Sequence, residues 1–323
     1  MVGEEVSSKQ QLLFLFSLPR SGSTLLQRVF RQLDEIDTAP ETWLMLPYIS
    51  PFKDGIQYTV YSARHSKIAT NEFIRSGIGW VQFNNFLKKF LEDVVFSSGG
   101  GARFFLEKTP RNLFVAKEIQ EVFGCDAKYV YLARNPVAVA CSMMTTWGRG
   151  RASLHLFYQD FMLGINGFAE SYDAEKHILI RYEDLVRDST KSLFKVSEYL
   201  SIDTSSLNLS AIEPLSGIMG DPTGQYAYHG LESSRADAWT SVINSWTKVF
   251  VLRRLIRAIG AKKLEIMGYD YDDTLLKIRL YGDYSFVAEV LDLCGVIYGC
   301  VCRLFQVRLL VELLQKKHGA ILR

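Results

Sequence analysis

The amino-acid sequence predicts an α/β protein with three layers, in which a central parallel sheet carries a phosphate loop and a helical extension follows at the C-terminus. Two observations lead to this fold class. Short apolar runs that end in polar turns are typical of buried strands, and longer helical patterns separate them. The strands are expected at 12–17, 103–107, 127–133 and 177–181, and the helices include 83–96, 113–123, 154–171 and 190–200.

Composition limits the domain organisation and the partners. The chain has 323 residues, of which 48% are hydrophobic, so it can bury a large core. No long Pro- or Ser-rich linker interrupts it. We therefore predict a flexible N-terminus (1–10), one main domain (11–273) and an apolar helical extension (274–323). The formal net charge of +2, without a dense basic patch, argues against a nucleic-acid partner.

The segment 12–26 carries the strongest functional signal. It predicts a buried strand, a tight polar turn and a helix, and the turn contains Pro19-Arg20-Ser21-Gly22-Ser23-Thr24. Free amides at a helix N-terminus, with hydroxyl donors and an arginine, form a cradle for a phosphate group. The alternative is an ordinary strand-to-helix turn with Ser23 or Thr24 as the helix cap.

This loop departs from the Walker A pattern of Mg-nucleotide proteins. The first glycine of that pattern is absent, and Ser23 stands where a lysine would follow Gly22. The loop resembles instead the 5′-phosphosulfate loop of sulfotransferases that use 3′-phosphoadenosine-5′-phosphosulfate (PAPS). The resemblance implies that Arg20, Ser21, Gly22, Ser23 and Thr24 bind this donor, with Arg20 directed at the leaving phosphate.

A second strand–turn–helix unit lies at 128–142. Asn135 is a natural helix N-cap and Pro136 suits the first helical position. Arg134 then stands at the C-terminal end of the strand, where open α/β sheets bind ligands, and Ser142 follows on the helix. The spacing of eight residues between Arg134 and Ser142 resembles the 3′-phosphate site of the same family. A helix-end salt bridge and a small packing residue are the alternative roles.

A third unit, at 177–188, predicts a strand that runs into an acidic turn. The turn is similar to one in the family, and the resemblance places Tyr182 near the adenine. Alternatively, Tyr182 is a half-buried aromatic residue, and Glu183 and Asp184 favour a helix start. The three units occur in the family's order over about 190 residues.

Sulfuryl transfer resembles phosphoryl transfer and needs donors on the departing phosphate, a cation at the bridging oxygen and a base for the acceptor proton. Lys108 is the candidate cation. It lies in the turn Glu107-Lys108-Thr109-Pro110, which is similar to a turn of sulfotransferases that act on glycans. A surface lysine paired with Glu107 is the alternative.

The base is predicted to be a carboxylate. Small-molecule cytosolic sulfotransferases place a histidine where this chain has Pro110. Glu41 follows the helix after the phosphate loop, and its position resembles that of the catalytic base of tyrosylprotein and heparan sulfate sulfotransferases. Glu107 is the reserve candidate, and a surface charge is the alternative role for Glu41. His65 and His155 lack motif support.

Two loops carry weaker signals. Arg149 and Arg151 could contact the 3′-phosphate or an anionic acceptor, or belong to a solvated basic loop. The Gly- and Tyr-rich stretch 220–230 is expected to form a mobile lid.

The five cysteines show no metal-ligand spacing and the N-terminus is polar. We therefore expect a reduced, cytoplasmic chain that requires no metal. The tail 286–314 is very apolar, but charged residues leave only about ten uncharged positions in a row, half of what a spanning helix needs. We expect helices packed on the core or in a homodimer, or a helix at the membrane surface.

Together these features predict a sulfotransferase that moves a sulfuryl group from PAPS to a hydroxyl or amine of a glycan, a lipid-linked sugar or a natural product. One alternative is a P-loop kinase-like phosphotransferase that uses ATP, which should contain Gly-Lys-[Ser/Thr]. The other is a non-catalytic nucleotide-binding module, which should lack the charged candidates.

Overall fold

The computed structural model describes residues 10–53, 63–213, 230–281 and 284–304. The chain divides into two compact units, each built from several segments. The first unit contains the residues up to Arg134, together with Leu163–Ala236 and Ile266–Gly268. The second unit contains Asn135–Met162, Asp237–Glu265 and the residues from Tyr269 onward.

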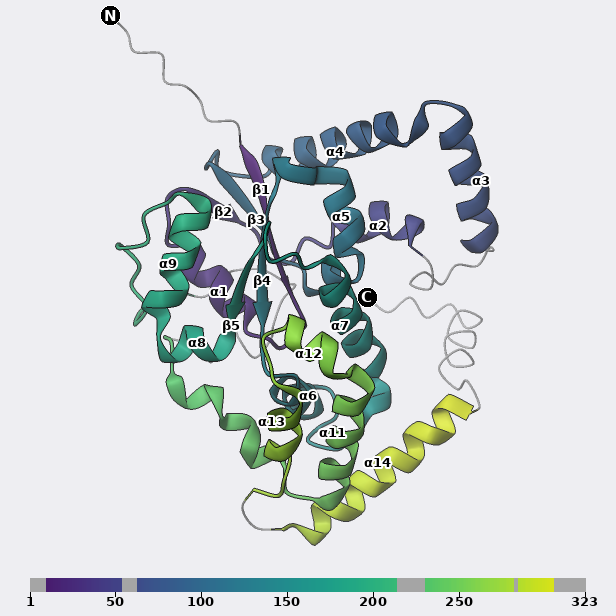
Figure 1. Cartoon of the computed structure of the whole chain (residues 1–323), viewed down its shortest axis with the longest axis vertical. Helices are drawn as coiled ribbons and strands as arrows, with labels where there is room; N and C mark the ends of the chain where they lie inside the picture. Colours follow the sequence, from purple (N-terminus) through teal and green to yellow (C-terminus); the bar gives the residue numbers. More distant parts are fainter. Residues whose placement is uncertain (1–9, 54–62, 214–229, 282–283, 305–323) are drawn as a thin grey trace, which may run out of the picture. The chain divides into compact units, whose positions relative to one another are not determined.

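In the described part of the first unit, five parallel strands form one sheet in the order β2-β3-β1-β4-β5 (Figure 1). The predicted α/β class is confirmed, and each of the four predicted strands lies within one residue of its expected bounds. The fifth strand, β2, was not predicted, because it has three residues and forms an edge of the sheet. The strands are β1 (Gln11–Ser17), β2 (Ile36–Thr38), β3 (Phe104–Glu107), β4 (Lys128–Ala133) and β5 (Ile178–Arg181).

Alternate side chains of β1 enter two different cores. Leu13 and Leu15 pack in a cluster with residues of α1 (Ser23–Phe30), α8 (Tyr182–Arg187) and α9 (Ser189–Leu200). Phe14 points to the opposite face, where its ring centroid lies 5.3 Å from that of Phe123 on α5 (Ala116–Phe123). Successive side chains of a strand point to opposite faces of the sheet. These contacts therefore show that helices cover both faces.

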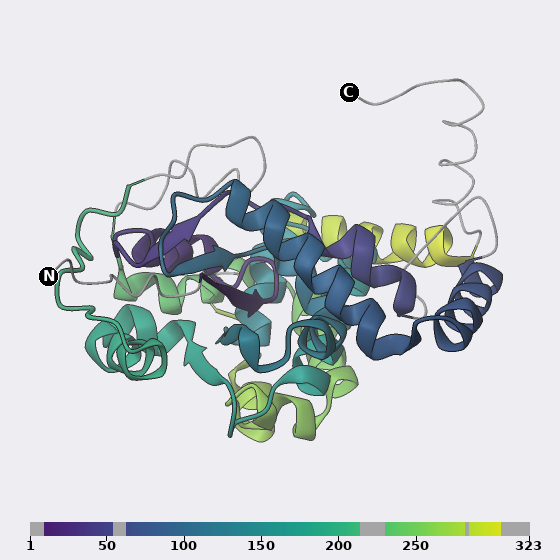
Figure 2. The same cartoon turned by 90° about the horizontal axis from the view of Figure 1, so that it is seen from above.

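The connection from β2 to β3 contains α2 (Met45–Ile49), α3 (Ala63–Ser76) and α4 (Gly79–Ser97), as Figures 1 and 2 show. The helix predicted at 83–96 lies inside α4, whereas α3 was not predicted. The helix predicted at 113–123 begins as a 3-10 helix, Pro110–Val115, before α5 starts. The other 3-10 helices of this unit are Ser50–Phe52, Gly124–Asp126 and Ser233–Ala236.

The second unit begins with α6 (Pro136–Thr146). The Asn135 side chain accepts a hydrogen bond from the Val137 amide at 2.9 Å, and Pro136 is the first helical residue, as predicted. The helix expected at 154–171 is a 3-10 turn (Leu154–Leu156) followed by α7 (Tyr158–Ser171), which continues into the first unit. The remaining elements are the 3-10 helix Ala238–Val242, α11 (Trp246–Ile259), α12 (Ala261–Ile266), α13 (Tyr271–Lys277) and α14 (Phe286–Leu304).

Candidate active site

The predicted site residues of the first unit follow the C-terminal ends of the parallel strands, so they meet along one edge of the sheet. Glu41 comes three residues after β2, and Lys108 directly follows β3. The phosphate loop (18–22) follows β1, Arg134 follows β4, and Tyr182 follows β5. Across the sheet, the order is therefore carboxylate, lysine, phosphate loop, arginine and tyrosine.

The phosphate loop is a tight turn whose helix has a glycine at its N-cap position. The Ser21 amide donates to the Leu18 carbonyl at 3.2 Å, and Gly22 adopts a left-handed conformation with φ of +92° before α1 begins at Ser23. Gly22 has no side chain that could cap the first-turn amides. The alternative in which Ser23 or Thr24 is the N-cap is therefore wrong.

Tyr182 and Arg134 brace this loop. A Cβ atom at Gly22 would lie 2.5 Å from the Tyr182 ring, so the loop backbone rests directly on the buried ring. The guanidinium carbon of Arg134 lies 4.4 Å from the ring centroid. Arg134 also donates to the backbone carbonyls of Arg20 (3.0 Å) and Arg235 (3.4 Å). These contacts hold one arginine against the loop.

Two buried polar atoms at the loop have no hydrogen-bond partner among the described residues. They are the Ser21 hydroxyl and Nε of Arg134. A buried polar group without a partner costs about 1–3 kcal/mol. In addition, Arg20 adopts a left-handed φ of +69°, which is strained for a residue with a side chain. The unpaired donors and the strained backbone fit a loop that is completed by a bound anion.

Lys108 is a buried cation beside the first turn of α1. The residue is only 2% exposed, and its Nζ lies 3.0 Å from Oε1 of Glu41 and 3.4 Å from Oγ1 of Thr24. The alternative of a surface lysine paired with Glu107 is wrong. In the structure, Lys108 pairs instead with Glu41, the carboxylate predicted as the base.

The Glu107 carboxylate is buried, and both of its oxygens accept hydrogen bonds. Oε2 accepts from the Thr42 hydroxyl (2.8 Å), and Oε1 accepts from the Thr109 hydroxyl (2.7 Å) and the Asn112 amide (3.1 Å). Burial raises the pKa of Glu107, while these hydrogen bonds and the Lys108 charge act in the opposite direction. Because Thr42 adjoins Glu41, these hydrogen bonds connect the turn that contains Lys108 to the loop that contains Glu41, here called the Glu41 loop.

The residues that hold the loop with Glu41 were not predicted from the sequence. Gln27 on α1 donates to the Thr38 hydroxyl (2.7 Å) and to the Ala39 carbonyl (2.8 Å), and the Trp43 amide donates to the Thr109 hydroxyl (3.2 Å). The one available signal was an amide side chain on a helix whose neighbouring residues are mostly apolar and buried.

Other predicted residues lie elsewhere. Ser142 is on α6 of the second unit, and Arg149 and Arg151 follow that helix. The expected lid at 220–230 falls outside the described residues, apart from Gly230. In the described ranges, no group of three or more His, Cys, Asp or Glu residues has an arrangement that could hold a metal ion.

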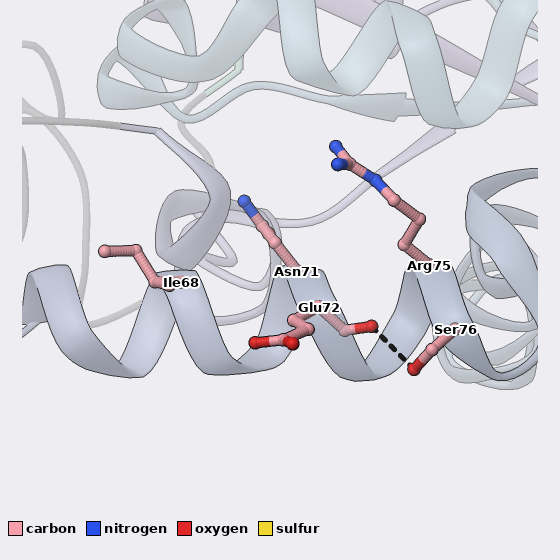
Figure 3. Close-up of a pocket in the computed structure, with 5 residues that line it drawn as sticks. All are labelled: Ile68, Asn71, Glu72, Arg75 and Ser76. Atoms are coloured by element: carbon pink, nitrogen blue, oxygen red, sulfur yellow. Dashed lines mark hydrogen bonds between the residues drawn. The ribbon is translucent and has the colours of Figure 1, made fainter.

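A surface hollow lies on α3 (Figure 3). A single helix supplies the residues that line it, which include Asn71, Glu72 and Arg75. None of them belongs to the motifs singled out by the sequence, so the hollow is not the candidate nucleotide site.

Comparison with known proteins places the chain in a family. A model of the sulfotransferase family matches residues 13–206. Nodulation protein NoeE of Sinorhizobium fredii (strain NBRC 101917 / NGR234) is 26% identical over an alignment of 238 residues, and the match covers 66% of this chain and 55% of that protein. The chain therefore spans about half the length of this relative.

The solved structures to which the chain is similar include two sulfotransferase domains, one from the Synechococcus PCC 7002 olefin synthase and one from the curacin biosynthetic pathway. Both are 20% identical, with TM-scores of 0.49 and 0.48. They match 80% and 77% of this chain, and 94% and 97% of their own chains. The sulfotransferase from Alicyclobacillus acidocaldarius is 15% identical with a TM-score of 0.45, over 81% of this chain and 97% of its own.

The family match covers more than half of the chain and includes the phosphate loop, Lys108, Arg134 and Tyr182. This protein belongs to the sulfotransferase family.

The contact between Gly22 and Tyr182 leads to a first prediction. Gly22→Ala should lower the stability by about 1–3 kcal/mol and abolish the binding of the nucleotide that the sequence predicts for this loop, because the new methyl group overlaps the ring. Thermal unfolding and calorimetric titration with 3′-phosphoadenosine-5′-phosphate (PAP) would measure both effects. Gly101→Ala is the matched control, since Gly101 has a similar φ of +91° but no atom within 4 Å of a Cβ. Equal losses in both variants would mean that the Tyr182 contact is unimportant.

Proposed function

We propose that this protein transfers the sulfuryl group of PAPS to a hydroxyl or amine acceptor, with Glu41 as the general base. The observation that carries this proposal is the position of Lys108, whose ammonium group lies between Thr24 of the phosphate-loop helix and the Glu41 carboxylate. A cation and a base thus adjoin each other where the loop would present the reactive end of a phosphosulfate.

The loop has the donors that such an anion requires. The uncapped amides of α1, the unpaired Ser21 hydroxyl and Nε of Arg134 are hydrogen-bond donors for phosphate or sulfate oxygens. Arg20 adds a cation to the same turn. Tyr182 lies behind the loop, against Gly22 and Arg134, and supports it. Its direct contact with adenine and the contact of Ser142 with the 3′-phosphate stay predictions.

The charged side chains have separate roles in the proposed transfer. The Glu41 carboxylate accepts the proton of the acceptor hydroxyl while the oxygen of that hydroxyl forms the new bond to sulfur. The bond between sulfur and the bridging oxygen breaks, and its electron pair stays on PAP. Lys108 and Arg20 stabilise the negative charge that develops on this leaving group. The proton ends on Glu41, the sulfuryl group ends on the acceptor, and PAP leaves.

Glu107 has a structural role in this proposal. Its two oxygens are occupied by Thr42, Thr109 and Asn112, and the side chain is buried. A base must reach the acceptor proton within hydrogen-bond distance, and Glu41 is the more exposed of the two carboxylates. Glu107 therefore positions the Glu41 and Lys108 segments.

The donor is tested by titration calorimetry with PAP and, separately, with Mg-ATP. We expect PAP to bind without added metal and Mg-ATP to bind much more weakly or not at all. Exclusive binding of Mg-ATP would contradict the proposal and favour a kinase-like phosphotransferase. Incubation with radiolabelled PAPS and panels of glycans, lipid-linked sugars and natural products would then identify the acceptor.

Arg134 supplies the second prediction. Arg134→Ala should weaken PAP binding about 10–100-fold, because a charged hydrogen-bond donor is worth about 1.5–3 kcal/mol. The measurement is calorimetry with PAP. Arg103→Ala is the control, because Arg103 also stacks on an aromatic ring (4.8 Å) and donates to a carbonyl, but precedes β3 at the opposite edge of the sheet. Unchanged affinity in Arg134→Ala would remove this arginine from the site.

A further inference from the structure

In the second unit, the acidic side chains of helix α14 face neighbouring segments of the same unit. The Glu289 carboxylate accepts from the backbone amides of Trp246 (2.7 Å) and Thr247 (3.1 Å), at the first turn of α11. Asp292 is 1% exposed and accepts from the Ala152 amide (2.7 Å) and the Ser245 hydroxyl (2.5 Å). These bonds fix one face of α14 to α11 and to the segment after α6.

Two glycines extend this inward face. A Cβ at Gly295 would lie 3.0 Å from the Ser153 hydroxyl, and one at Gly299 would lie 2.7 Å from Nδ1 of His155. Gly295 and Gly299 stand three and seven residues after Asp292, so they occupy the same side of the helix. Their lack of side chains lets the helix backbone approach the 151–155 segment closely.

The outward face of α14 is apolar. From Phe286 to Val301 both acidic residues point inward, and every exposed side chain is aliphatic, aromatic or a cysteine. Leu293 and Ile297 are 52% and 55% exposed. A helix on the surface of a globular protein normally has the reverse pattern, with its apolar face against the core. The exposed residues are Phe286, Val287, Val290, Leu291, Leu293, Cys294, Ile297, Tyr298, Cys300 and Val301.

The size of this face argues against a second copy of the chain as its partner. At 1.5 Å per residue, the segment 286–301 is about 24 Å long, and half of a cylinder about 10 Å wide presents about 400 Å². A stable protein–protein interface buries about 800 Å² on each partner. The α14 face alone therefore provides about half of the area that a dimer would need.

The charge of the residues that follow this face favours a lipid surface as its partner. The residues from Arg303 to the end of the given sequence include five Lys or Arg and one Glu, which suits anionic headgroups. No helix in the ranges that the structure describes is long and apolar enough to cross a membrane. We propose that the apolar face of α14 docks in the plane of an anionic lipid bilayer. This inference does not depend on the proposed sulfuryl transfer.

Flotation of the full chain on a density gradient tests the docking. The probe is a vesicle of phosphatidylcholine with phosphatidylglycerol. We expect wild-type protein to float with the vesicles, and Leu293→Glu/Ile297→Glu to lose at least about tenfold in partitioning, because two apolar side chains become charged. Val81→Glu/Phe86→Glu is the matched control on α4, where these side chains are 79% and 58% exposed. It should float like wild type.

Three results would overturn the proposal. Wild-type protein could stay at the bottom of the gradient, or the α4 control could lose as much binding as the α14 variant. Sedimentation equilibrium could also show a wild-type dimer that the α14 variant dissociates, without vesicle binding, which would make α14 a self-association surface. Circular dichroism melting of each variant shows whether it is folded, and all of the substituted side chains are exposed.

Discussion

Glu41→Gln should lower kcat by about 10²–10⁴-fold, because general base catalysis contributes a factor of this size. The amide keeps the shape of the side chain, and its oxygen can still accept from Lys108, which lies 3.0 Å away. PAP affinity and the melting temperature should therefore stay close to wild type. Initial rates with radiolabelled PAPS and calorimetry with PAP would measure the two effects separately.

Two further Glu→Gln substitutions distinguish a base from a structural carboxylate. Glu118→Gln is the matched control, because Glu118 forms a partly buried ion pair with Lys53 that involves no motif residue. It should leave kcat unchanged. Glu107→Gln should lower the melting temperature, since an amide cannot accept at both ends from Thr42, Thr109 and Asn112. If Glu41→Gln retains activity while Glu107→Gln is folded and inactive, the roles proposed for the two carboxylates are reversed.

Lys108→Met should reduce kcat by about 10²–10³-fold, the usual loss when a donor aimed at developing charge is removed. Methionine fills a similar volume in this buried position without the ammonium group. PAP binding should fall much less than kcat, because the charge on the bridging oxygen grows during transfer. The measurement is the same pair of rate and binding assays.

The control for this variant is Lys53→Met, which removes a lysine from the ion pair with Glu118 and should keep full activity. The double variant Glu41→Gln/Lys108→Met tests whether the pair acts as a unit. If it does, the double variant should be only slightly slower than the slower single variant. Fully multiplicative losses would mean that Glu41 and Lys108 act independently.

Much of the sheet and of the phosphate loop could be predicted from local sequence. The strands are apolar runs followed by turns, and the loop and the Asn135-Pro136 cap are short patterns with a direct physical meaning. Each pattern fixes the conformation of a few adjacent residues. For this reason the predicted bounds of β1 and β4 lie within one residue of those observed.

The rest depends on contacts between distant residues. The pairing of β2 with β3 brings Glu41 to Lys108, although 67 positions separate them and β2 has three residues. The local sequence around Gln27 and Glu107 does not show which loops these side chains hold. Likewise, composition shows that the 286–301 segment is apolar, but only the bonds of Glu289 and Asp292 determine which face of α14 is exposed.

The parallel order of the strands has a consequence for how the length of this protein can vary. The few residues that follow the C-terminal end of each strand contribute to the site. The pairing register between neighbouring strands sets the positions of these ends relative to one another. A single-residue deletion in β3 would shift Lys108 by about 3.3 Å and reverse the faces of the side chains before it. The long connection from β2 to β3 leaves the site after Glu41 and returns to the sheet at the N-terminal end of β3, so its part around α3 can lengthen or shorten without such a shift. Insertions in related chains should therefore accumulate in that connection rather than in the strands.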